Sequence, residues 1–121
     1  MITGHINADL EPLLNDVYLR ANDGSLIAVR TILDTGFNST FCFPKHLFEK
    51  LNLEYFGEGV FVLADGMPTD ETIYLGEVIV ENQPYIVEMT ATESDLALMG
   101  MEMLLEREAI FNLRDMTVKV I

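Results

Sequence analysis

The sequence has few basic residues, a single cysteine, no tryptophan and no long apolar run. Seven Lys and Arg stand against 20 Asp and Glu, which gives a formal net charge of −13 in 121 residues. A surface this negative repels nucleic-acid phosphates and anionic lipid, so we expect no nucleic-acid partner and no membrane partner. Cys42 cannot form an internal disulfide, so nothing indicates an oxidising compartment.

The sequence also shows no pattern typical of a secretion signal or of a membrane-spanning segment. Residues 1–6 lack the basic region and apolar block of a secretion signal. The longest apolar stretches, such as residues 96–101, fall far below the roughly 18 residues of a membrane-spanning helix. His5 and His46 are isolated and have no ligand spacing, so we expect no metal site and no cofactor. The composition therefore predicts a single cytoplasmic domain over residues 1–121.

The chain does contain many short apolar segments separated by turns rich in glycine, proline and asparagine. Three hairpins are expected, with strands at residues 17–20 and 26–33, at 60–63 and 72–75, and at 77–80 and 85–89. Further strands are expected at residues 109–113 and 116–121, and short helices after Pro44 and at residues 102–107. Pro12 is expected to interrupt any regular element near the N-terminus. Together these segments predict an all-β, barrel-like fold with one or two short helices.

The motif that indicates chemistry is Asp34-Thr35-Gly36, which directly follows a short apolar strand. The tripeptide alone is weak evidence, because chance gives it in about 4% of shuffled chains of this composition. Its context is more specific. Roughly sixty residues later, a second motif consists of two apolar residues, Leu98 and Met99, followed by a glycine. A hairpin with a Gly-containing tip lies between the two motifs.

This order of parts resembles the retropepsin-like aspartic proteases. It is most similar to the small prokaryotic branch whose motif reads Asp-Thr-Gly-Phe, since Phe37 follows the glycine here. The resemblance covers about residues 17–120 and implies a closed β-barrel with a hairpin flap over the active site. It also implies that chain ends interleave between protomers, which residues 117–121 would do here. The implied function is an acid protease, a homodimeric aspartic endopeptidase that acts on an extended peptide or protein.

The resemblance assigns a role to each matching residue. Asp34 is the implied catalytic residue. The implied supports of its loop are Thr35, Gly36, Leu98, Met99 and Gly100. The implied substrate contacts, in the cleft and the flap, are Phe37, Ala64, Asp65, Gly66 and Met67.

The chemistry explains why such a chain needs a twofold partner. Peptide hydrolysis by this route uses two carboxylates that lie close together and share one proton, because two like charges at that distance cannot both ionise. This chain has one Asp-Thr-Gly motif, so a homodimer would have to supply the second carboxylate.

Several residues also fit plainer interpretations. Phe37 could fill core instead of lining a cleft, and Asp65 could simply stabilise a turn. Cys42 is expected to be a small buried side chain, and the four methionines in residues 89–103 to fill core. For the whole chain, one alternative is a non-catalytic dimerisation or peptide-binding module on the same scaffold. An unrelated acidic β-barrel that mediates interactions is a weaker one.

Overall fold

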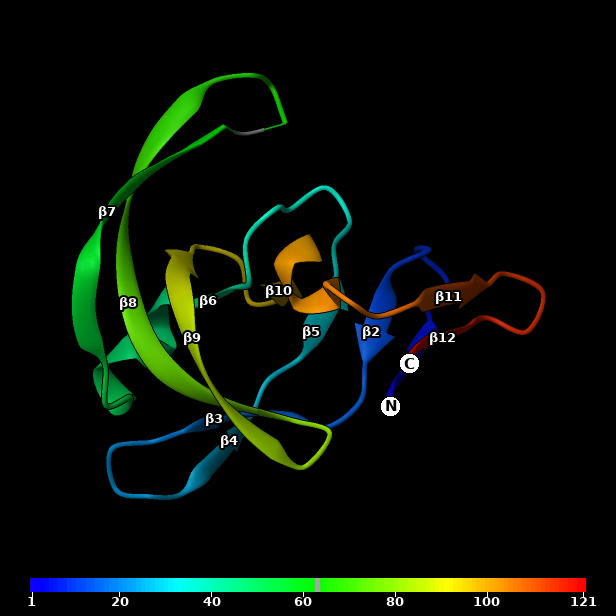
Figure 1. Ribbon diagram of the computed structural model, residues 1–121, viewed down its shortest axis with the longest axis horizontal. Coiled ribbons are helices and arrows are strands. Elements are labelled where there is room, and N and C mark those ends of the chain that lie inside the picture. Colours follow the sequence, from blue (N-terminus) through cyan, green and yellow to red (C-terminus); the bar gives the residue numbers. More distant parts are fainter. Residues whose placement is uncertain (63) are drawn as a thin grey trace.

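Strands make up most of the described residues, 1–62 and 64–121, in the computed structural model of the chain (Figure 1). The first six strands are β1 (Ile2–Ile6), β2 (Pro12–Leu14), β3 (Val17–Arg20), β4 (Leu26–Ala28), β5 (Thr31–Leu33) and β6 (Phe41–Pro44). The other six are β7 (Glu54–Val62), β8 (Pro68–Val80), β9 (Gln83–Thr92), β10 (Ala97–Met99), β11 (Ala109–Asn112) and β12 (Thr117–Val120). Two short 3₁₀ helices, η1 (Lys45–Lys50) and η2 (Met101–Leu104), lie near the expected positions. The predicted all-β class is confirmed. Neither helix is long or apolar enough to cross a membrane, as far as the described residues go.

The strands pair into one sheet in the order β11–β12–β1–β2–β5–β10–β6–β9–β8–β3–β4, with β7 added to β8. β7 and β8 form a strongly curved arc along one side of the molecule, with β9 on its inner side (Figure 1). The sequence predicts a closed barrel, but the pairing among the described residues ends at β4 and β11, which are not joined to each other.

The expected hairpins are present, with different strand limits. The second and third hairpins share one strand, because β8 pairs with β7 along its first part and with β9 along its second. The expected strand at residues 26–33 is wrong as a single element. It is split into β4, which pairs with β3, and β5, which pairs with β2 and β10. Leu63, expected to end one strand, lies outside the described residues.

The expectation that Pro12 would interrupt regular structure near the N-terminus is also wrong. Pro12 is the first residue of β2, where it pairs with Ile6 of β1. Proline is tolerated at the first position of a strand because its missing N–H need not join the ladder. The Asn7 side chain makes the turn before it, since its oxygen accepts hydrogen bonds from the N–H groups of Asp9 and Glu11.

The end of the chain is paired within the same molecule. β12 has β1 on one edge and β11 on the other, so both of its edges are occupied. The expectation that residues 117–121 would interleave with a partner chain therefore needs correction. The edge left open at this end of the sheet belongs to β11.

The core lies beneath the strands that carry the Asp-Thr-Gly loop. Phe41 and Phe43, two apart on β6, stack with ring centroids 5.1 Å apart. Met89 and Met99 are fully buried, as expected for core-filling methionines, whereas Met101 is 42% exposed. Strands β5 and β10 thus pack on this core through Leu33 and Met99, which holds the end of β5 in place.

Candidate functional site

Strand β5 delivers Asp34 directly beside β10. The two strands run parallel, with Ile32 opposite Leu98 and Leu33 opposite Met99. At the end of β5 the Asp34 N–H donates a hydrogen bond of 2.9 Å to the Met99 carbonyl. Two motifs far apart in the sequence are therefore adjacent in the fold.

A tight turn fixes the Asp34 side chain. The Phe37 N–H donates to the Asp34 carbonyl at 3.2 Å, and the Gly36 N–H donates to Asp34 Oδ1 at 2.9 Å. The second contact is the one hydrogen bond that the described residues make to this carboxylate, so its other oxygen is free to act on a ligand. Asp34 is half-buried, whereas Thr35 and Gly36 are exposed.

Gly100 lets the loop after Asp34 return close to β10. Its N–H donates to the Thr40 carbonyl at 2.7 Å, and the Met101 N–H donates to the Phe37 carbonyl at 2.8 Å. A Cβ atom at Gly100 would lie 2.1 Å from the Ser39 carbonyl oxygen and 2.7 Å from that of Phe37. Only glycine permits this close approach of two backbones.

A cavity of about 500 Å³ opens between the Asp34 loop and the β7–β8 hairpin. We call it the loop cavity. It is lined by Gly36, Phe37, Asn38, Cys42, Val60, Phe61, Val62, Glu71, Thr90, Ala91, Thr92 and Leu98. Phe37 lines this cavity and also packs on Gly100, so its position is compatible both with lining a cleft and with filling core.

The tip of the β7–β8 hairpin is a turn. Gly66 has φ +82°, and the Met67 N–H donates to Asp65 Oδ1 at 2.9 Å, which gives Asp65 a turn-forming role. Ala64 and the other tip residues are exposed and, within the described part of the chain, are not among the residues that line the loop cavity. The arms of the hairpin supply that lining instead. Sequence reasoning missed them because the curvature of β7 and β8 decides which of their residues face the loop.

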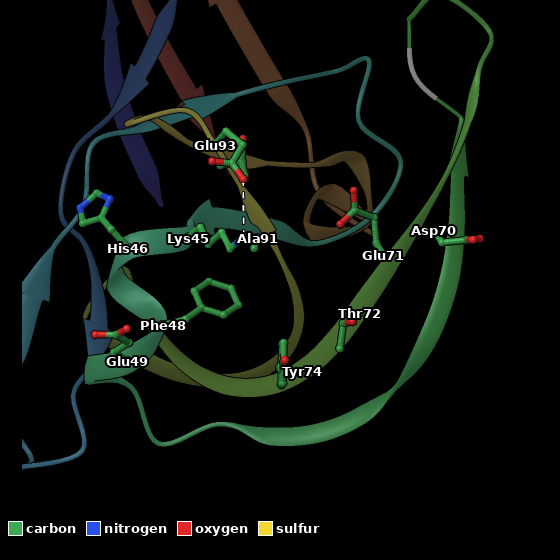
Figure 2. A pocket seen from close by; sticks show the side chains of 11 residues that line it. Lys45, His46, Phe48, Glu49, Asp70, Glu71, Thr72, Tyr74, Ala91 and Glu93 are labelled. Atoms are coloured by element: carbon green, nitrogen blue, oxygen red, sulfur yellow. Dashed lines mark ion pairs between the residues drawn. The ribbon is translucent and has the colours of Figure 1, made fainter.

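A second and larger cavity, the η1 cavity, is lined by residues of η1, β8 and β9, and Figure 2 shows their side chains. Its volume is about 1070 Å³. It shares Glu71, Ala91 and Thr92 with the loop cavity and adds Lys45, His46 and Phe48 from η1, among others. No local pattern in the sequence predicts this cavity, because the fold brings together residues of η1, β8 and β9 that are far apart in the chain.

Asp34 and Thr35 are not among the described residues that line the loop cavity. They line a depression of about 580 Å³ on the opposite side of their loop. We call this surface the apolar face. Its apolar lining consists of Ile6, Leu10, Pro12, Ile32, Leu33, Leu98, Phe111 and Leu113. The Asp34 loop therefore separates a cavity under the hairpin from an apolar surface.

Cys42 is buried beside this site and is expected to be unreactive. Burial raises the pKa of its thiol to about 11, and the negative charges of Asp34 and Glu71 act in the same direction. A rise of about two units lowers the thiolate fraction at pH 8 by roughly 100-fold. We predict that iodoacetamide labels native Cys42 at least about 100-fold more slowly at pH 8 than the urea-unfolded chain. Equal labelling rates, measured by mass spectrometry, would contradict this.

Comparisons with known proteins support the fold. No protein-family model matches the chain, and no curated protein matches it either. Among solved structures it is similar to a retropepsin-like aspartic protease from Rickettsia conorii. The TM-score is 0.61 over 98% of this chain and 89% of that chain, at 16% sequence identity. The chain therefore shares the fold of that protein.

Proposed function

We propose that the protein is a homodimeric aspartic endopeptidase in which Asp34 of each chain forms a catalytic pair on a twofold axis. The observation that carries the proposal is the placement of Asp34. It ends β5 against β10, on a loop braced by Gly100, in a fold shared with a retropepsin-like aspartic protease. One carboxylate oxygen is held by Gly36, which leaves the other for a water molecule or a substrate.

The apolar face supports a dimer that brings the two Asp34 residues together. Leu10 is 66% exposed, Phe111 39% and Leu113 63%, and all three line the same depression as Asp34 and Thr35. Exposed apolar side chains gathered in one place typically mark a protein-protein interface. A twofold axis beside Asp34 would bury them and place two equivalent carboxylates at the centre.

The proposed chemistry uses one ionised and one protonated carboxylate. The ionised Asp34 takes a proton from a bound water, whose oxygen attacks the peptide carbonyl carbon. The protonated Asp34 donates a hydrogen bond to the carbonyl oxygen and stabilises the charge that develops there. Transfer of a proton to the amide nitrogen then allows the C–N bond to break. The substrate would lie extended between the loop cavity and its symmetry copy.

The test is Asp34→Asn. The amide oxygen can still accept the Gly36 N–H, so the turn and the dimer should persist, while cleavage falls at least about 1000-fold because no carboxylate remains to move the proton. Cleavage of a diverse unstructured peptide mixture between about pH 3 and 7 is followed by mass spectrometry.

The matched control is Asp95→Asn, at an exposed turn residue, which should cleave like the wild-type protein. Equal cleavage by the Asp34→Asn and wild-type proteins would overturn the proposal. A wild-type dimer that cuts nothing would instead favour the non-catalytic peptide-binding module.

A further inference from the structure

Glu71 projects from β8 into the space beside the proposed catalytic loop. It is half-buried, whereas its neighbour Asp70 is exposed. Figure 2 shows the Glu71 side chain directed inward and the Asp70 side chain directed outward, although Asp70 also borders the η1 cavity. As far as the described residues show, Asp70 does not line the loop cavity. The alternation of a β-strand explains this contrast between two adjacent acidic residues.

The Glu71 carboxylate lies where the two cavities meet. It lines both the loop cavity and the η1 cavity. Gly36, Phe37 and Asn38, in the loop that follows Asp34, line the same loop cavity as Glu71. A peptide that occupied the loop cavity would therefore contact both Glu71 and the loop that follows Asp34.

No cationic partner neutralises Glu71 within the described part of the chain, and no hydrogen bond is made to it there. Lys45, which lines the η1 cavity, lies 3.7 Å from Glu93. Arg20 and Arg107 are paired with other glutamates elsewhere on the surface. Glu71 therefore presents an uncompensated negative charge to the cleft.

Apolar side chains lie beside Gly59, the residue opposite Glu71 in the neighbouring strand. Glu71 is opposite Gly59 in the β7–β8 ladder, so no side chain covers it from the neighbouring strand. A Cβ atom at Gly59 would lie 2.9 Å from Ile73 and 3.4 Å from Phe61, which shows that both side chains close around the glycine. A ligand with an aliphatic stem and a cationic end matches a carboxylate set among such groups.

We propose that Glu71 is a specificity-determining residue that binds a lysine or arginine side chain of the peptide substrate. This rests on the proposed function, because it takes the loop cavity as part of a peptide-binding cleft. The stem of the basic side chain would pack on Phe61 and Ile73 while its charge pairs with Glu71. Twofold symmetry would place one Glu71 on each side of the scissile bond, so basic residues are favoured on both sides of the cut.

Binding is measured on the Asp34→Asn protein, so that cleavage does not consume the probe. The probes are two rhodamine-labelled unstructured peptides that differ only in Lys against Gln near their centre, followed by fluorescence anisotropy at 0.15 M salt. The Lys peptide should bind about tenfold more tightly than the Gln peptide. Adding Glu71→Gln should reduce that preference to less than about twofold, whereas adding Asp70→Asn should leave it largely intact.

Each outcome is decisive for the role of Glu71. The proposal is overturned if the Lys peptide is not preferred, or if Glu71→Gln keeps the preference. It is also overturned if Asp70→Asn removes the preference equally, because the overall negative charge would then be the cause. Failure of the proposed function is visible separately: the wild-type protein would cut neither peptide while the Glu71-dependent preference remained.

Discussion

Replacing Gly100 by alanine is expected to destabilise the protein by more than about 3 kcal/mol and to abolish any cleavage that depends on Asp34. The added Cβ would lie 2.1 Å from the Ser39 carbonyl oxygen, a contact that forces the backbone to move. The position of a Cβ atom is fixed by its own backbone, and the oxygen belongs to the Ser39 main chain, so no side-chain rotation can relieve the contact. The hydrogen bonds from Gly100 to Thr40 and from Met101 to Phe37 would be lost or lengthened with it.

Urea unfolding followed by circular dichroism checks the loss of stability. The matched control is Gly57→Ala on β7, where a Cβ would meet nothing within 4 Å. We expect that variant to change stability by less than about 1 kcal/mol. If the Gly100→Ala protein unfolds at the same urea concentration as the wild-type protein, the bracing role assigned to Gly100 is incorrect.

The strands that pair locally could be predicted from the sequence, because their turn residues are explicit. Gly24, with φ +88°, lies in the tight turn that joins β3 to β4, and the Asn-Asp-Gly sequence predicts such a turn. The break between β4 and β5 could not be predicted. It arises because β4 pairs with β3, whereas β5 pairs with β10, which lies more than sixty residues further along the chain. Pairing over such distances is decided by packing of the whole sheet, which local propensity does not describe.

The same distinction applies to the candidate site. The proximity of Asp34 to Leu98 and Met99 followed from a family resemblance, and the parallel β5–β10 ladder agrees with it. Glu71 could not be identified in advance, because the sequence has 20 acidic residues and nothing local distinguishes this one. Strand alternation directs Glu71 and Asp70 to opposite faces of β8, and the curvature of β8 makes the face that carries Glu71 the inner one. Which side chains of a curved strand face the loop is thus a property of the sheet and not of a motif.

Introducing aspartate at Phe111 and Leu113 together is expected to convert the protein into a monomer that cannot cleave. The proposed dimer buries Phe111 and Leu113 of both protomers. Each of these side chains contributes about 1.5–3 kcal/mol of hydrophobic stabilisation. The new carboxylates would also add repulsion between two chains that each carry a net charge of −13. The dissociation constant should rise at least 100-fold, which corresponds to about 2.7 kcal/mol.

The fold of each chain should survive this change, because Phe111 is 39% exposed and Leu113 63% exposed before any partner binds. Sedimentation velocity measures the oligomeric state, and circular dichroism confirms the fold. Ile86→Asp is the control, since Ile86 is 69% exposed but lines a cavity apart from Asp34. That variant should remain a dimer and remain active. A wild-type protein that cleaves as a monomer would exclude the paired-aspartate mechanism, because one chain supplies a single Asp-Thr-Gly loop.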